Sequence, residues 1–111
     1  MNNQAMMEFQ KTHQRLQQIT VQKQSTKTEQ KEVGNALKEL EGSKDEDVYK
    51  SVGSILISKD FEEMKKELEE KKESLEVRMK SLEKREKKLR KKVEESQKKL
   101  RSQMQNQNMA Q

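Results

Sequence analysis

The apolar residues of the chain fall into two regions of helical spacing, separated by one short apolar run. In the first region a single seven-residue frame places the apolar side chains at the two core positions of a coiled coil. One core position holds Phe9, Leu16 and Leu37, and the other holds Ala5, Ile19, Val33 and Leu40. This spacing predicts a helix over residues 5–41, which Gly42 is well placed to end.

The second region has the stronger heptad pattern. One core position repeats every seven residues, and these positions are Phe61, Leu68, Leu75, Leu82 and Leu89. Met79, Val93 and Leu100 occupy the complementary position. Asp60, with Glu63 three residues later, is a variant of a capping box. We therefore expect a second helix over residues 60–104, followed by a frayed tail at 105–111 that loses both charge and periodicity.

The run between the two helical regions is dense in β-branched, aliphatic and aromatic residues. It splits at Gly53-Ser54, where glycine can supply the positive φ of a two-residue turn, so it predicts a β-hairpin over residues 47–58. The residues expected to carry oligomerisation are Val48, Tyr49, Val52, Gly53, Ile55, Leu56 and Ile57. An isolated two-stranded hairpin is marginally stable in water, so these strands are expected to meet strands of other chains.

The two helices each carry one narrow apolar stripe and need a partner to cover it. The predicted fold is therefore mainly α, a single domain over residues 1–111 in which the helices form a long antiparallel coiled coil. If Leu40 lies near Met64, Met6 falls near residue 98 and both chain ends meet at one tip. Polar residues interrupt both seams, which lowers stability but can fix the register; they are Thr12, Lys23, Thr26, Gln30, Lys65, Lys72, Glu86 and Ser96.

The expected tip collects apolar residues from both ends of the chain. Its candidate binding residues are Met6, Met7, Phe9, Leu100 and Met104, with Met1 and Met109 beside them. Methionine is unbranched and adapts to irregular apolar surfaces, which favours a site for many partners. The alternative interpretation is that these are ordinary terminal residues without a function.

The composition narrows the class of protein. Of the 111 residues, 41% are charged and 28% hydrophobic, with two Phe, one Tyr and no Trp. This is too little apolar material for one globular core, whereas long coiled-coil helices tolerate it. The chain has no cysteine, no apolar run long enough to span a membrane and no signal-peptide pattern, so a soluble cytoplasmic protein is expected.

The charged residues give little support for catalysis. His13 is the one histidine, and no nucleophile, phosphate loop or metal-spaced cluster accompanies it, so neither an enzyme nor a metal site is predicted. Residues 84–92 form a basic run, and the net charge of +5 raises nucleic acid or an acidic protein surface as a partner. A solvated helix face is the preferred interpretation of this run, because it contains no aromatic residue for base stacking.

Several motifs, in this order, resemble a prefoldin subunit of the beta type. They are VYKSVG at 48–53, ILI at 55–57, LEVRM at 75–79, LE at 82–83 and EKKL at 86–89. Beta-type subunits carry a single hairpin between their helices, and only one such run is present in this sequence. The similarity covers residues 9–100.

The resemblance implies a cochaperone that works without ATP and without a cofactor. Two alpha-type and four beta-type subunits would pool their hairpins into a β-barrel, hold unfolded client proteins at the coiled-coil tips and deliver them to a group II chaperonin. Lys98, Lys99 and Arg101 are the candidate contacts to an acidic chaperonin surface. Neither a membrane nor nucleic acid is expected as a partner, although a nucleic-acid-binding or scaffolding coiled coil remains the alternative function.

Overall fold

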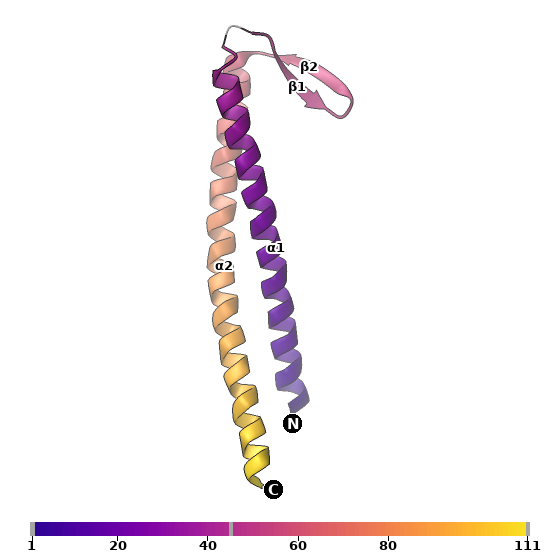
Figure 1. Cartoon of the computed structure of the whole chain (residues 1–111), viewed down its shortest axis with the longest axis vertical. Helices are drawn as coiled ribbons and strands as arrows, with labels where there is room; N and C mark the ends of the chain where they lie inside the picture. Colours follow the sequence, from indigo (N-terminus) through magenta and orange to yellow (C-terminus); the bar gives the residue numbers. More distant parts are fainter. Residues whose placement is uncertain (1, 45, 111) are drawn as a thin grey trace. The chain divides into compact units, whose positions relative to one another are not determined.

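The computed structural model describes residues 2–44 and 46–110, and the side chains of residues 4–44 and 46–106. One antiparallel hairpin connects two helices, in the chain order α1 (Asn2–Glu41), β1 (Val48–Val52), β2 (Ile55–Lys59) and α2 (Phe61–Ala110) (Figure 1). This is the mainly helical fold expected from the sequence. Met1 and the side chain of Met109, both assigned to the tip, lie outside the described residues.

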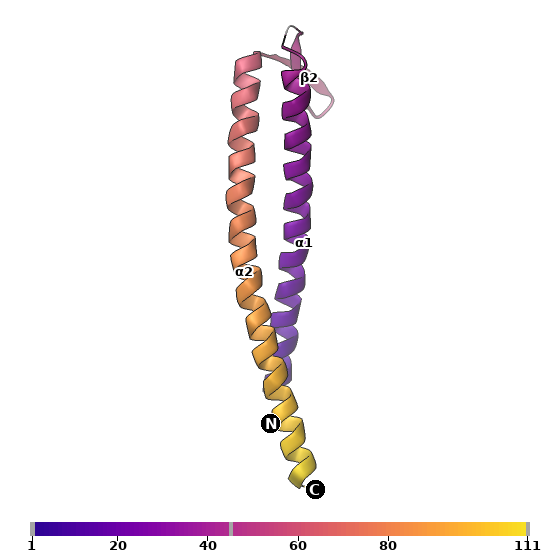
Figure 2. The same cartoon turned by 60° about the vertical axis from the view of Figure 1, so that its left-hand side comes forward.

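The chain divides into two compact units. We call residues 25–79 the hairpin unit and residues 1–24 with 80–111 the helical unit. Within each unit, the segments of α1 and α2 run antiparallel and side by side, as two views of the chain show (Figures 1 and 2). Because each turn of a thin helical pair meets only the turns that face it, contacts stay local along its length.

The hairpin unit contains the more completely buried part of the seam. Its buried apolar side chains are Val33, Leu40, Met64, Leu75 and Met79. Leu75 is the most enclosed of them, with 1% of its surface exposed. Thr26, a polar residue at a predicted core position, is also buried here.

The helical unit has fewer buried residues in its seam. Ala5, Ile19 and Leu82 are buried. The remaining apolar seam residues of this unit are half-buried, and they are Phe9, Leu16, Leu89, Val93 and Leu100. The heptad positions were therefore predicted correctly, but burial along this part of the seam is partial.

The end of α1 falls where the sequence predicts it, although by a different geometry from the usual glycine cap. Gly42 N–H donates to the Lys38 carbonyl at 3.2 Å, and Ser43 N–H donates to the Leu40 carbonyl at 3.0 Å. Gly42 does not adopt a positive φ, since Gly53 alone does so among the described residues. The last turn thus tightens toward a 3₁₀ geometry instead of ending in a left-handed residue.

Helix α2 begins as predicted and ends later. The Asp60 carbonyl accepts the Met64 N–H at 2.9 Å, as expected for a residue at the N-cap. The helix then continues to Ala110, whereas the sequence analysis ended it near Met104. No Gly or Pro interrupts residues 103–110, and their Gln, Met and Ala residues have good helix propensity, so loss of charge does not end the helix.

The hairpin has a two-residue turn. Val52 pairs with Ile55, which leaves Gly53 and Ser54 as the turn residues. Gly53 has φ of +60°, and no residue other than glycine has a positive φ in the described chain, as in a type II′ turn. The sequence-based assignment of the turn is confirmed.

Candidate functional site

The β-hairpin exposes apolar side chains on both faces. Directly paired residues share a face, so Val52, Ile55 and Ile57 lie on one face, and Tyr49 and Leu56 lie on the other. All five side chains are exposed, from 44% for Ile57 to 68% for Leu56. In the part of the chain that the structure describes, the sheet has only these two strands, so both outer edges have unpaired backbone groups. Such a hairpin has the chemistry of an assembly surface.

One carboxylate of α2 contacts both strands of the hairpin. Glu67 Oε2 lies 3.3 Å from Lys50 Nζ on β1, and Glu67 Oε1 lies 3.2 Å from Lys59 Nζ on β2. The hydrogen bonds from Lys59 and then Lys50 hold the pKa of Glu67 below its ordinary value. The sequence analysis did not find this contact, because nothing in the spacing of residues 50, 59 and 67 indicates that they meet.

A groove lies at the base of the hairpin. Its volume is about 390 Å³, and its apolar lining includes Leu40, Val48, Met64 and Leu68. Leu40 and Met64, whose proximity was the assumption used to count residues toward the tip, line the same groove. The groove leads from the buried seam to the exposed Tyr49 and so joins the core of the hairpin unit to its assembly surface.

The ends of the two helices carry the predicted tip residues. Met6, Met7 and Met104 are exposed by 45%, 67% and 60%. Phe9 and Leu100 are half-buried. Within the helical unit, α2 extends past the start of α1 in both views (Figure 2). The methionines therefore remain available to a partner, while Phe9 and Leu100 also belong to the seam.

Phe9 has an aromatic neighbour on its own helix. Its ring stacks on that of His13, with centroids 5.9 Å apart and an interplanar angle of 25°. The two residues are four positions apart on one helix, and that spacing was the available signal. His13 is exposed and serves to cover an aromatic ring at this position.

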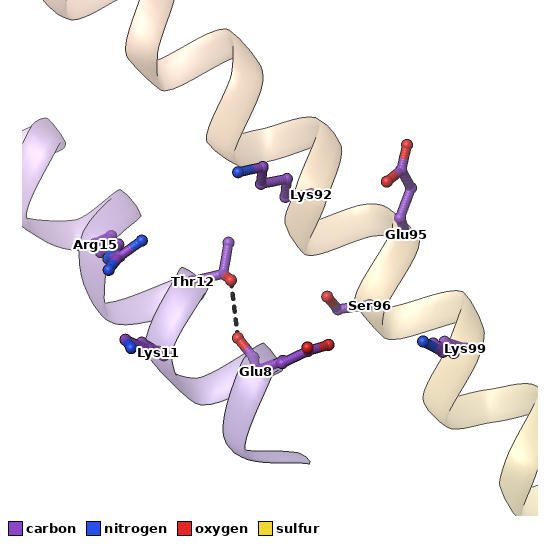
Figure 3. Close-up of a pocket in the computed structure, with 8 residues that line it drawn as sticks. All are labelled: Glu8, Lys11, Thr12, Arg15, Lys92, Glu95, Ser96 and Lys99. Carbon is purple, nitrogen blue, oxygen red and sulfur yellow. Dashed lines mark hydrogen bonds between the residues drawn. The ribbon is translucent and has the colours of Figure 1, made fainter. Parts of the chain in front are cut away.

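A polar groove interrupts the seam of the helical unit. Thr12 on α1 and Ser96 on α2, both predicted seam positions, line it together with charged residues (Figure 3). Those charged residues are Glu8, Lys11, Arg15, Lys92, Glu95 and Lys99. Thr12 Oγ1 donates to the Glu8 carbonyl at 2.8 Å, and the groove has a volume of about 410 Å³. The two helices are thus not sealed by apolar side chains at this level.

An ion pair crosses the same seam nearer the middle of α2. Lys23 Nζ lies 3.1 Å from Glu86 Oε1, with 26% and 15% of the side chains exposed. The hydrogen bond from Lys23 lowers the pKa of Glu86, to which Arg90 adds a smaller effect. Both residues were predicted to interrupt the seam, and the structure pairs them with each other. This contact favours one register of the helices, since a shift would bury two separated charges.

The predicted chaperonin contacts lie on the part of α2 that belongs to the helical unit. Lys98, Lys99 and Arg101 are exposed, and Lys99 also borders the polar groove. Among the described residues, no group of acidic, histidine or cysteine side chains is arranged to hold a metal ion. Neither helix contains, over its described length, an apolar stretch that could cross a bilayer.

Comparison with known proteins identifies the family. The family model for a prefoldin subunit matches residues 3–107. The crystal structure of the prefoldin beta subunit from Thermococcus strain KS-1 is similar, with 36% sequence identity and a TM-score of 0.78. The match covers 88% of this chain and 87% of the archaeal chain. No curated protein sequence matches significantly.

These matches include both helices and the hairpin between them, so they concern the whole fold. The chain belongs to the prefoldin subunit family. Its similarity to an archaeal beta subunit agrees with the single hairpin and with the motifs of the sequence analysis. The class is that of a non-enzymatic chaperone component, which assembles with other prefoldin subunits.

Proposed function

We propose that this chain is a beta-type subunit of a cytoplasmic, ATP-independent cochaperone. It assembles with alpha-type subunits and further beta-type copies as an α₂β₄ hexamer, in which the hairpins form a shared β-barrel. The complex holds unfolded proteins at the helix ends and delivers them to a group II chaperonin. The observation that carries the proposal is the hairpin with apolar side chains exposed on both faces in a member of the prefoldin family.

Exposure of the hairpin supports the assembly step. Tyr49, Ile55 and Leu56 are each more than half exposed. Burial of such apolar surface is the main favourable term in the free energy of association. Two unpaired edges offer backbone groups to further strands, and a closed barrel would remove those edges. Assembly through the hairpin would therefore satisfy both its apolar faces and its backbone.

Assembly can be tested with substitutions that retain β propensity. Ile55→Thr combined with Leu56→Thr should abolish the complex formed on mixing with an alpha-type subunit, as measured by native mass spectrometry. Ser51→Thr lies on the same hairpin and removes no apolar surface, so it should assemble normally. A double variant that assembled as well as the parent would contradict the proposal for the hairpin.

The exposed methionines support client binding. Met6, Met7 and Met104 lie at the helix ends and are available to an unfolded chain. Each offers only a weak apolar contact, but several subunits acting on one client raise its apparent affinity through effective concentration. Each single methionine contact to the client can still dissociate, which suits transfer of the client to another chaperone.

Client binding can be separated from assembly. Met6→Gln, Met7→Gln and Met104→Gln together should remove most suppression of client aggregation, as measured by light scattering, while the native mass of the complex stays unchanged. Val21→Gln with Val77→Gln is the matched control, since these side chains are 67% and 66% exposed at other positions. If the two sets reduced suppression of aggregation equally, the loss would come from removing any exposed apolar side chain. That result would contradict client binding at the helix ends.

Transfer to the chaperonin is proposed to use positive charge. Lys98, Lys99 and Arg101 would attract an acidic surface and raise the association rate, an effect that salt screens. Reversing the three charges to Glu should slow transfer, whereas Lys27→Glu, Lys66→Glu and Lys71→Glu should not. If the rate of transfer changed neither with salt concentration nor with charge reversal at Lys98, Lys99 and Arg101, this contact would be excluded.

A further inference from the structure

Lysines form a row along the outer face of α2 in the helical unit. They follow one another at intervals of four, three and four residues, the spacing of one helix face. The row consists of Lys80, Lys84, Lys87 and Lys91, all exposed. Leu82 and Leu89 belong to the seam on the other side of this helix, so the row points away from α1. We call these four residues the lysine row.

The net charge of the protein is concentrated around this row. Residues 80–101 contain eleven Lys and Arg and four Glu, a net charge of +7, whereas the whole chain carries +5. The rest of the chain is therefore net negative. A single helical segment provides all of the excess positive charge, which is a stronger asymmetry than the total suggests.

The ammonium groups of the row are not used in ion pairs within the described residues. Glu86, the acid in the middle of the basic run, contacts Lys23 and Arg90 instead. The run of residues 84–92 is therefore not a uniformly solvated face. Its one carboxylate is directed to the seam side, and the lysines on the opposite side keep their charge for a partner.

The surroundings of the row favour nucleic acid over a protein surface. In the described part of residues 80–101, no large apolar side chain is exposed. Tight protein interfaces depend on buried apolar or aromatic anchors, which the face of the lysine row lacks, whereas Lys and Arg side chains are sufficient to bind a phosphate backbone. The segment also contains no aromatic residue on which unpaired bases could stack, which favours a duplex over a single strand.

We propose that the lysine row binds the phosphate backbone of double-stranded nucleic acid without sequence preference. Neighbouring lysines of the row are separated by about 4.5–6 Å along the helix, and their long side chains can adjust to successive phosphates. The four ammonium groups are compact point charges on flexible side chains, and contacts to phosphates carry no sequence information. Neutralising about four phosphates predicts a slope of about −3.6 for the logarithm of the association constant against that of the salt concentration.

The test measures binding of the full chain to a labelled 20-base-pair DNA duplex by fluorescence anisotropy at several salt concentrations. Lys80→Gln, Lys84→Gln, Lys87→Gln and Lys91→Gln together should weaken binding about tenfold or more at low salt and bring the slope close to zero. The matched control replaces four exposed lysines of the hairpin unit by Gln, namely Lys27, Lys31, Lys66 and Lys71. It lowers the net charge equally and should retain the slope and most of the affinity.

Three outcomes would overturn the proposal. The first is that the parent chain does not bind the duplex at low salt. The second is that the row variant and the control variant weaken binding equally, which would attribute binding to net charge alone. The third is preferential binding of polyglutamate or of single-stranded DNA through the same four lysines, which would assign the row to an acidic protein or to unpaired bases. Circular dichroism of both variants verifies that the helices are intact. The result is independent of client binding, because no residue of the row belongs to the proposed tip or hairpin surface.

Discussion

The hairpin unit and the helical unit are built from the same pair of helices but differ in their seams. The hairpin unit buries Val33, Leu40, Leu75 and Met79 between α1 and α2. In the helical unit, most apolar seam residues are half-buried, and the polar groove around Thr12 and Ser96 lies between the helices. Ion pairs join the helices in both units, Glu41 with Lys65 in the hairpin unit and Lys23 with Glu86 in the helical unit, so the units differ in apolar packing.

The same helical pair can therefore serve two purposes. Apolar packing in a tight seam is costly to disturb, which suits a unit that must keep an assembly surface in place. Polar groups at seam positions can exchange protein contacts for water at small cost, which lets helices separate locally. We therefore expect the helical unit to accommodate clients of different size, and the hairpin unit to remain fixed.

The largest predicted effect separates the two seams directly. Leu75→Ala should lower the free energy of unfolding by about 3 kcal/mol, because it opens a cavity at the most buried side chain. Leu100→Ala removes the same atoms from a half-buried site and should cost about 1 kcal/mol. Urea denaturation followed by circular dichroism measures both. Similar losses would mean that the two seams are equally packed.

A smaller effect tests how the hairpin unit keeps its exposed strands. Gly53→Val should destabilise the hairpin by about 1–2 kcal/mol, since a β-branched residue is strained at a φ of +60°. An added Cβ meets no atom within 4 Å, so the cost comes from the backbone alone. Gly53→Asn, which tolerates this conformation better, is the control. Thermal stability of the assembled complex gives the readout, and an unaffected Val variant would contradict the role of the turn.

The next prediction closes the polar groove of the helical unit. Ser96→Leu should continue the apolar seam and raise the free energy of unfolding by about 1 kcal/mol. The same change at the exposed Ser102 should give no gain. If the loose seam serves client binding, Ser96→Leu should also reduce suppression of aggregation. A destabilised Ser96 variant would show that the groove is required in its polar form.

The smallest effect concerns the ion pair of the helical unit. Because the pKa of Glu86 is lowered in the folded protein, the pair stabilises fully above the ordinary carboxyl value of 4.5 and is lost as the pH falls through the lower folded value. Glu86→Gln should cost about 0.5 kcal/mol at pH 7 and reduce the acid dependence of stability. Denaturation midpoints at pH 7 and pH 3 provide the measurement. Identical pH dependence in both proteins would assign the acid response to other groups.

The sequence predicted the parts of the fold that depend on local pattern. The heptads placed Leu75 and Leu82 in the seam, and Gly53-Ser54 marked the turn, because side-chain periodicity and positive φ are properties of short segments. Helix α2 continues past the predicted end near Met104 to Ala110, because backbone propensity sustains a helix after charge and apolar spacing are lost.

The contacts between charged residues could not be predicted in the same way. Lys23 and Glu86 were recognised as seam interruptions, but these residues are 63 positions apart in sequence and their pairing depends on the register of the two helices. The contact of Glu67 with both strands depends on the direction in which the hairpin leaves α2. Such pairs require the relative placement of whole elements, which no local pattern contains.

The contact of Glu67 with Lys50 and Lys59 has a consequence for association. Since one carboxylate binds a lysine on each strand, it restricts rotation of the hairpin about its connection to α2 before a partner is present. A surface that is oriented beforehand loses less conformational entropy when it docks. Both pairs are partly exposed and therefore weak, so they bias the strands without locking them. The hairpin is thus preorganised for association, and its orientation relative to α2 can still adjust when another subunit binds.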